Sequence, residues 1–326
     1  MAVKPLVSIF TTCKNAENYI RGTLDSIFLQ SYDSIEILIS DGLSTDKTLT
    51  IIREYSQKHS QIRYKTEKDN DAIEGFYKAM SMASGKYIMC LPISDIYLSR
   101  SWIKNCVDAL ESDPELSLIF GCPANIDSND SITGVAFPEW LVKPPPSKKK
   151  LTSFYLATLC FIPEISYCVR RDVYIRCFPK NTDDTISHEL PKNEENHKVF
   201  RDPFLIFVLH FFKNGYLARY LPIISSAGRS HGDSRTLKLK QYLENDARLY
   251  VNDVIQLRRD ILRGKIKFSF RNSENQIIQT LNQKDRLMMF FQILKIRLTR
   301  DAMFGHRENL VMRSLKYLVG VLRSLV

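Results

Sequence analysis

Three aspartates follow segments that have the pattern of buried strands, and their carboxylates could hold a phosphorylated ligand together with a cation. Each stands just past a predicted strand: Asp41 after residues 35–40, Asp69 after 62–66 and Asp95 after 87–91. In open α/β sheets, ligands bind beyond the carboxyl ends of the strands. Acids gathered there repel one another unless a cation separates them, and a hard divalent cation bridges carboxylate and phosphate oxygens. Each aspartate could instead cap a helix or form a turn, but for all three together we favour the ligand site.

Two further candidates stand in the second half of the chain. Asp202 lies just ahead of the apolar run PFLIFVLHFF, which predicts a helix that ends near Asn214 and Gly215. His231 lies in the Gly- and Ser-rich segment SSAGRSHGDSRT, which predicts a loop. From this pattern alone, His231 is more typical of a polar loop residue than of a metal ligand.

The segment 35–55 indicates how the chain would position Asp41. A buried strand leads into Asp41, a tight turn at Gly42 follows, and a helix comes next. The hydroxyl of Ser44 or Thr45 is a suitable N-cap for that helix, and the charge of Asp46 favours its positive start. Apolar residues then recur at helical spacing and would pack the helix on the sheet.

Residues 1–121 alternate predicted strands with predicted helices. The strands cover residues 6–12, 35–40, 62–66, 87–91 and 116–120, and further helices cover 17–30, 72–84 and 102–110. Gly85 would close the helix 72–84 in the position that tolerates a left-handed backbone. Strands separated by helices predict a parallel sheet with right-handed crossovers. The three aspartates would therefore share one edge of the sheet.

The middle of the chain is less regular. Residues 122–150 include the proline-rich, basic segment KPPPSKKK, which is typical of an exposed loop. The apolar segment 151–170 could form the floor of a second subsite, and the polar segment 178–200 predicts a long loop.

The C-terminal third is predicted to be helical and basic. A helix is expected at residues 237–262, and residues 285–326 interleave Lys and Arg with apolar positions at helical spacing. A basic amphipathic helix can lie in a membrane interface. It can equally pack on its own domain or on a second subunit, so a homodimer is compatible with this pattern.

Composition narrows the class of protein. The 326 residues, 44% of them apolar, predict one main domain with an appendage. The net charge of +10 favours anionic partners without identifying them. Seven scattered cysteines are typical of a reducing compartment. The first apolar run is too short for a signal peptide, and no run approaches the ~18 residues of a membrane span. We therefore expect a cytoplasmic protein.

Several motifs resemble family-two glycosyltransferases. The opening VSIFTTCKNAENYI is similar to that family's V-S-I-I-T-P-T-Y-N-A, and SDGLSTDKT is close to its S-D-G-S-T-D-x-T. The segment EKDNDAIEGFYKAMSMASGKYIMCLPISDIY aligns without gaps to the family's pattern, which ends in L-N-S-D-D-x-Y. Later, FRDPFLIFVLHFFKNGY and GRSHGDS are more loosely similar to two further motifs. The resemblance covers about residues 5–235 in the family's order.

This resemblance implies a GT-A fold, an α/β fold with a Rossmann-like, mostly parallel sheet flanked by helices. It implies a glycosyltransferase domain at 1–235, with a nucleotide-binding half at 1–121 and an acceptor-binding half at 122–235, followed by a helical basic region at 236–326. By position, Thr11, Asp41 and Asp69 would contact the nucleotide. Asp95 and His231 would bind Mn²⁺ or Mg²⁺, and Asp202 would be the general base.

The implied activity is transfer of a sugar, with inversion, from a nucleotide-sugar donor to a glycan or lipid-linked acceptor in surface polysaccharide biosynthesis. The resemblance favours UDP over GDP and dTDP, and such acceptors would place the protein at the inner face of the plasma membrane. No motif supports nucleic-acid binding, and the absence of GxGxxG after the first strand argues against a dinucleotide-dependent oxidoreductase.

Two departures from the family pattern favour an alternative. Ser94 replaces the first acid of the family's S-D-D, which removes one carboxylate from the expected metal site. Arg201 replaces the Glu beside Asp202, and a neighbouring cation would lower the pKa of that acid and weaken it as a base. The alternative is a degenerate paralogue that binds nucleotide or glycan without turnover.

Overall fold

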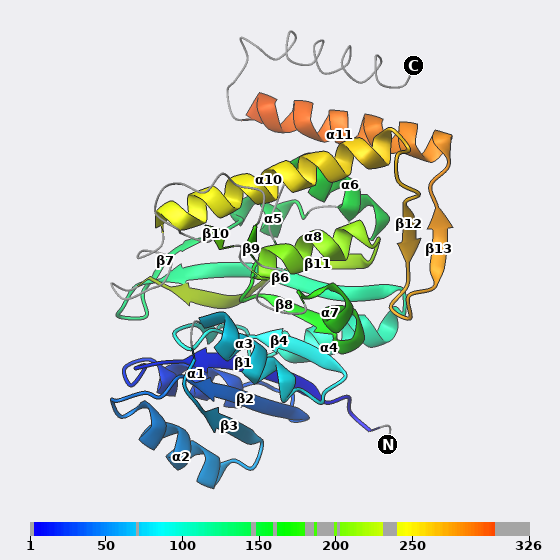
Figure 1. Cartoon of the computed structure of the whole chain (residues 1–326). Coiled ribbons are helices and arrows are strands. Elements are labelled where there is room, and N and C mark those ends of the chain that lie inside the picture. The colour runs from blue at the N-terminus through cyan, green and yellow to red at the C-terminus, as the bar shows by residue number, and fades with distance from the viewer. Residues whose placement is uncertain are drawn as a thin grey trace.

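The computed structural model describes residues 3–69, 72–144, 148–158, 162–179, 186–187, 199–200, 203–230 and 240–303. Within these residues, one large sheet has the strand order β3-β2-β1-β4-β8-β6-β11-β5, with β7 beside β6 (Figure 1). Its strands are β1 (Val7–Cys13), β2 (Ile35–Asp41), β3 (Ile62–Thr66), β4 (Tyr87–Cys90), β5 (Ile96–Tyr97), β6 (Leu116–Ile126), β7 (Ile132–Val135), β8 (Tyr167–Arg170) and β11 (Leu217–Arg229).

The half of the sheet built from β1 to β4 has the predicted parallel arrangement. β2 pairs with β3 and β1, and β1 pairs with β4, all in parallel. β1, β2 and β4 are apolar runs buried on both faces, as expected of strands covered by helices. The register places Cys13 opposite Asp41, so the carboxyl ends of β1 and β2 are level.

The other half of the sheet is mixed, which agrees with the mostly parallel sheet that the resemblance implies, although its antiparallel strands were not predicted. β8 lies between β4 and β6 and is antiparallel to both. Residues 122–126, expected to be irregular, extend β6, and Pro123 is accommodated where the β6–β11 register shifts. Residues 225–229, expected in a loop, belong to β11 and pair with β6. Segment 151–170, expected to form the floor of a second subsite, supplies most of a helix at 149–158 and β8.

Helices cover this sheet. They are α1 (Ile20–Phe28), α2 (Thr48–Lys58), α3 (Ala72–Ser81), α4 (Trp102–Ser112), α5 (Pro138–Val142), α6 (Lys149–Thr158), α7 (Arg171–Cys177), α8 (Pro203–Lys213), α10 (Lys240–Leu262) and α11 (Gln283–Met303). Two short hairpins are formed by β9 (Ile186–Ser187) with β10 (Val199–Phe200) and by β12 (Ser269–Arg271) with β13 (Ile277–Thr280). α8 ends beside Gly215, whose φ of +76° closes it as predicted.

Gly85 is needed for a reason other than the predicted one. α3 ends at Ser81, and Gly85 is not among the residues with positive φ. A Cβ at this position would lie 2.7 Å from the carbonyl oxygen of Leu6 and 2.7 Å from the hydroxyl oxygen of Ser8. Glycine is therefore required because the chain entering β4 passes directly against β1.

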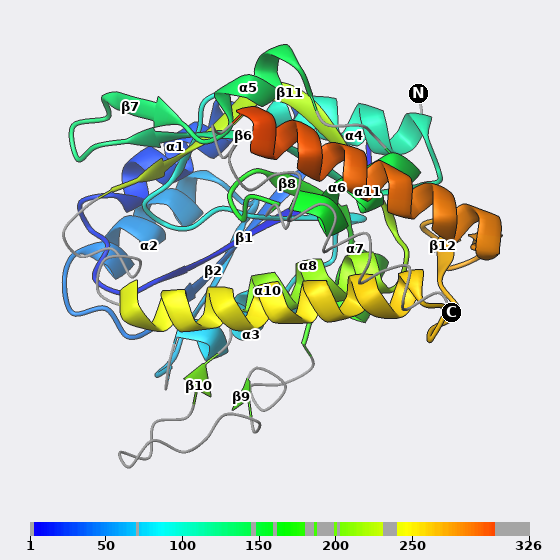
Figure 2. The same cartoon turned by 90° about the horizontal axis from the view of Figure 1, so that it is seen from above.

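The C-terminal helices pack on the main body. α10 contacts α8, and α11 contacts both α6 and α10 (Figures 1 and 2). On α11, Met289, Phe290 and Ile293 are buried, whereas Leu287 and Phe291 are about half exposed. The described part of segment 285–326 thus packs on its own chain, and residues 304–326 lie outside the described residues. No described helix is both long enough and apolar enough to cross a membrane.

Candidate functional site

Asp41 ends β2 and is fully buried. Its Oδ2 accepts the backbone N–H of Ser44 at 3.2 Å, and its Oδ1 accepts the Ser44 hydroxyl and, at 3.7 Å, the thiol of Cys13. Burial, reinforced by the charge of Asp41, raises the pKa of the Cys13 thiol far above its ordinary value. Cys13 therefore remains a protonated donor to Asp41.

The start of α2 differs from the prediction for Ser44 and Thr45. α2 begins at Thr48, and neither Ser44 nor Thr45 caps it. Instead, the Thr48 backbone N–H donates to Oδ1 of Asp46 at 2.9 Å, so Asp46 does stabilise the helix start as expected. Ser44 is therefore a hydrogen-bond donor to Asp41, three residues earlier in the chain, rather than a helix cap.

Asp69 lies against Gly42, the residue after Asp41, because two glycines make room for it. A Cβ on Gly42 would approach the Asp69 Oδ2 to 3.0 Å, and one on Gly75 would approach it to 2.8 Å. The Asp69 Oδ1 accepts a hydrogen bond from Nζ of Lys78 at 2.8 Å. This hydrogen bond, which Lys78 donates to Asp69, raises the pKa of Lys78, so this amine stays charged. The structure thus places Asp69 between Gly42 and Gly75, with Lys78 as its cation.

Thr11 lies near the end of β1 and is buried. Its backbone pairs with Ile39, two residues before Asp41, so Thr11 belongs to the same part of the sheet edge. Within the described part of the chain, its hydroxyl has no hydrogen-bond partner. Six other buried side-chain atoms of the described residues are likewise unpaired, so this feature does not by itself distinguish Thr11 as a ligand contact.

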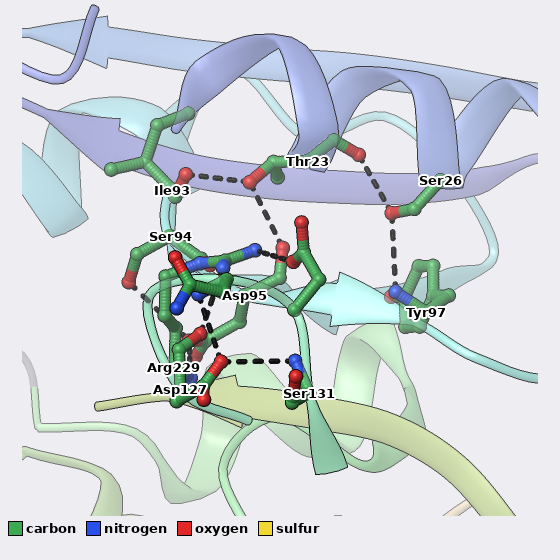
Figure 3. Close-up of polar contacts among 11 residues, drawn as sticks. Thr23, Ser26, Ile93, Ser94, Asp95, Tyr97, Asp127, Ser131 and Arg229 are labelled. Carbon is green, nitrogen blue, oxygen red and sulfur yellow. Dashed lines mark hydrogen bonds and ion pairs between the residues drawn. The ribbon is translucent and has the colours of Figure 1, made fainter. Parts of the chain in front are cut away.

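Asp95 follows β4 and is held by contacts from two other elements (Figure 3). Its Oδ1 accepts the backbone N–H of Arg229 at 2.9 Å and the hydroxyl of Ser94 at 3.3 Å. On the α1 side, the Thr23 hydroxyl donates to the carbonyl oxygen of Asp95 at 2.9 Å. Burial raises the pKa of Asp95 to about 6, and the Arg229 N–H and Ser94 hydroxyl offset part of that effect. Asp95 is therefore ionised near neutral pH.

The three aspartates lie at the carboxyl ends of parallel strands, as predicted from the sequence. Asp41 and Asp69 come together around Gly42, while Asp95 has its own surroundings between α1 and β11. Asp202, its neighbour Arg201 and His231 lie outside the described residues. Sequence reasoning missed Lys78, Thr23 and the role of Arg229. The four-residue spacing of Glu74 and Lys78 is a detectable signal for an ion pair, and these side chains are 3.2 Å apart.

The donor atoms near Asp95 suit a cation that is shared with a phosphorylated ligand. Among the described residues, no group of three His, Cys, Asp or Glu side chains could hold a metal ion alone. Asp95 offers one hard carboxylate, and Ser94 stands beside it in place of a second acid. Mg²⁺ is usually bound by one or two carboxylates together with substrate phosphates rather than by an all-protein cage. The residues present fit that kind of site.

The family model of glycosyl transferase family 2 matches residues 8–178. The chain belongs to this family. The match runs from β1 to the end of α7, so it includes every strand that presents one of the three aspartates. The resemblance found in the sequence motifs is thereby confirmed.

Individual relatives agree with this assignment. Chondroitin synthase of Escherichia coli is 30% identical over 149 residues, which is 46% of this chain and 21% of that protein. The chain thus spans about a fifth of that relative's length. Two solved structures are similar in fold: S. aureus TarS 1–349 in complex with UDP-GlcNAc, and the mannosyltransferase PcManGT of Pyrobaculum calidifontis in complex with GDP-Man and Mn²⁺.

The structural likeness covers nearly the whole chain. TarS has a TM-score of 0.54 at 14% identity, over 98% of this chain and 82% of the TarS chain. PcManGT has a TM-score of 0.53 at 15% identity, over 99% of this chain and 87% of the PcManGT chain. At such identities the likeness establishes the fold, which is GT-A, and it confirms the predicted α/β class.

Proposed function

We propose that this protein is an inverting glycosyltransferase that transfers one sugar from a nucleotide-sugar donor, a UDP-sugar, to a glycan or lipid-linked saccharide. The observation that carries the proposal is the family match over residues 8–178, which includes Asp41, Asp69 and Asp95 at the strand ends. The similarity to a chondroitin synthase supports a role in surface polysaccharide biosynthesis.

The nucleotide would bind at the ends of β1 to β3. Asp41 would accept a hydrogen bond from the base, and Asp69 and Thr11 would make further nucleotide contacts. The Asp41 carboxylate already accepts three hydrogen bonds, two of them from Ser44, so Ser44 would have to share that carboxylate with the base. Lys78 offsets the negative charge of Asp69, which lowers the electrostatic barrier to an anionic donor.

The donor diphosphate would lie near Asp95. Asp95 and His231 would hold Mn²⁺ or Mg²⁺, which when bound neutralises charge on the leaving diphosphate. The mannosyltransferase PcManGT, whose structure contains GDP-Man and Mn²⁺, supports this choice of cation. Above its pKa of about 6, Asp95 is in the ionised form that a cation requires.

Transfer itself would be a direct displacement. Asp202 would take the proton of the acceptor hydroxyl while that oxygen forms a bond to the anomeric carbon. The bond between the anomeric carbon and the diphosphate oxygen breaks at the same time, and the nucleoside diphosphate leaves. Attack on one face and departure from the other invert the anomeric configuration.

The test is turnover with defined donors. UDP-, GDP- and dTDP-sugars are incubated with Mn²⁺ and with short oligosaccharide or lipid-linked saccharide acceptors, and the products are analysed by NMR. We expect one class of donor to give a product with inverted anomeric configuration, and Asp95→Ala to abolish the reaction. A product with retained configuration would refute the mechanism. Donor binding without turnover on any acceptor would indicate the degenerate paralogue suggested by Ser94.

Peripheral binding to the inner membrane face extends this proposal. On α11, Leu287, Met288 and Phe291 are 45%, 53% and 51% exposed, and the segment 285–326 is rich in Lys and Arg. Exposed apolar and basic residues together suit an anionic lipid surface. Co-sedimentation with anionic liposomes should be lost at high salt and reduced in Phe291→Ser. Liposome binding that Phe291→Ser leaves unchanged would show that the exposed apolar face of α11 does not contact the membrane. A dimer that Phe291→Ser disrupts would show that this face binds a second copy of the chain.

A further inference from the structure

The guanidinium group of Arg229 joins the loop that carries Asp95 to a distant turn. Its Nε donates to the carbonyl oxygen of Ser94 at 3.0 Å, and its Nη1 donates to that of Asp127 at 3.1 Å. Its Nη2 forms an ion pair with Asp130. The arginine side chain is only 6% exposed. A cation buried to this extent needs its hydrogen-bond partners, so these contacts are specific constraints on the two loops.

The turn contacted by Arg229 is itself well fixed. It joins β6 to β7, and the Asp127 carboxylate accepts the backbone N–H groups of Asn129 at 2.8 Å and Ser131 at 2.9 Å. Asp130 has a φ of +66°, a conformation that is uncommon for a residue other than glycine. Because the turn is closed by its own hydrogen bonds, it provides Arg229 with an anchor on the other side of Asp95 from α1 (Figure 3).

The same loop is held from α1 as well. The Thr23 hydroxyl oxygen lies 2.5 Å from the carbonyl oxygen of Ile93 and 2.9 Å from that of Asp95, and its single proton is shared between these two acceptors. One residue of α1 and one residue of β11 therefore hold the backbone of residues 93–95 between them, and the Arg229 backbone N–H also contacts the Asp95 carboxylate (Figure 3).

We propose that Arg229 and Thr23 are positioning residues that fix the Asp95 carboxylate for a cation bound to the donor diphosphate. The inference rests on the proposed function and deepens it. With Ser94 in place of a second acid, and with no group of three metal-ligating side chains among the described residues, the orientation of the Asp95 carboxylate depends on its surroundings. Residues that orient metal ligands typically affect metal affinity by 10- to 100-fold when they are changed.

The test measures cation affinity rather than activity. Mn²⁺ is titrated into the full-length protein with saturating UDP, and free Mn²⁺ is followed by electron paramagnetic resonance. Arg229→Lys and Thr23→Val should weaken Mn²⁺ binding about tenfold or more. A lysine cannot reproduce the three directed contacts of the guanidinium, and valine preserves the shape of threonine but lacks its hydroxyl. Thr23→Ser, which keeps the hydroxyl, should restore most of the affinity.

A second readout separates positioning from a merely structural role. UDP affinity in EDTA, measured by calorimetry, should be the same in wild type, Arg229→Lys and Thr23→Val. Wild-type Mn²⁺ affinity in a folded Thr23→Val would overturn the inference, as would equal loss of Mn²⁺ affinity in Thr23→Ser and Thr23→Val. If wild-type protein itself takes up no Mn²⁺ with UDP, the proposed function fails instead, so the two failures are distinguishable.

Discussion

The carboxylate of Glu36 should be a main determinant of stability in the nucleotide-binding half. It is 7% exposed and accepts hydrogen bonds from the Ser8 hydroxyl at 2.6 Å, the Ser84 N–H at 2.7 Å and the Gly85 N–H at 3.1 Å. The Arg63 guanidinium lies on its other oxygen. This one side chain on β2 therefore fixes the chain where it enters β4, the strand that leads to Asp95.

Glu36→Ala removes the acceptor of the buried Ser8 hydroxyl and of the Ser84 N–H, whereas the Gly85 N–H keeps the Ser8 hydroxyl oxygen as an acceptor at 2.8 Å. A buried unsatisfied group costs about 1–3 kcal/mol, so the free energy of unfolding should fall by about 1–3 kcal/mol. That is a sizeable part of the ~5–15 kcal/mol typical of a folded domain. Glu36→Gln keeps one oxygen for Ser8, Ser84 and Gly85 and loses only the ion pair with Arg63. It should therefore be destabilised much less than Glu36→Ala.

The contribution of Glu36 to the free energy of unfolding should also depend on pH. Burial raises the pKa of Glu36, but the hydrogen bonds from Ser8, Ser84 and Arg63 outweigh it, and the net pKa is lowered. Because the pKa of Glu36 is lower in the folded state than its ordinary 4.5, the ionised carboxylate stabilises the fold above pH 4.5. This stabilisation is lost as the pH falls below 4.5 and through the lowered pKa of the folded state. Glu36→Gln should lose less stability between pH 6 and pH 3 than wild type does, as chemical denaturation at each pH would show. Equal stabilities of wild type and Glu36→Ala at pH 7 would refute this reasoning.

Three further predictions concern the same sheet edge. Gly85→Ala should lower the free energy of unfolding by about 1–3 kcal/mol because its Cβ would lie 2.7 Å from both the Leu6 carbonyl oxygen and the Ser8 hydroxyl oxygen. Gly22→Ala, with nothing within 4 Å of its Cβ, should not destabilise the fold, and thermal denaturation of both variants checks this. Lys78→Met should destabilise the protein because Asp69 loses its cation, and a double-mutant cycle with Asp69→Asn should show that the two changes are not additive. Burial raises the pKa of Asp95 from 3.8 to about 6, so its ionisation opposes folding as the pH rises from about 4 to 6. At pH 8 in EDTA, Asp95→Asn should therefore raise the free energy of unfolding by up to about 3 kcal/mol. This gain should vanish near pH 4, and a gain that persists there would contradict the assignment of the buried charge.

The nucleotide-binding half could be predicted because its signals are local. β1, β2 and β4 are rich in apolar residues, and each is followed by a helical pattern, so strand ends and the aspartates beyond them could be read from the sequence. The later half depends on contacts that are distant in sequence. β5 has two residues and β8 has four, which is too short for a periodic signal. Ser225 and Ser226 resemble a loop in composition, yet they are fully buried because β6 and β5 flank them.

The partners of the site residues were beyond sequence reasoning for the same reason. Arg229 contacts Asp95 across 134 residues of sequence, and Thr23 reaches its backbone across 72. No spacing rule links such positions, and the predicted loop at 225–236 assigned Arg229 no contact at all. Gly85 shows a different limit of sequence reasoning. A glycine at this position was predicted to adopt a left-handed backbone, whereas it is needed because Leu6 and Ser8 lie too close for a side chain.

Thermal stability with nucleotide and cation tests the central claim most directly. UDP, GDP and dTDP are added with and without Mn²⁺, to wild type and to Asp95→Ala. A ligand at 100 times its dissociation constant stabilises a fold by about 2.7 kcal/mol, which is a readily measured shift in melting temperature. Our account predicts that UDP stabilises wild type more strongly with Mn²⁺ than without it and that Asp95→Ala loses the cation-dependent part. Absence of stabilisation by every nucleotide, with or without cation, would contradict it.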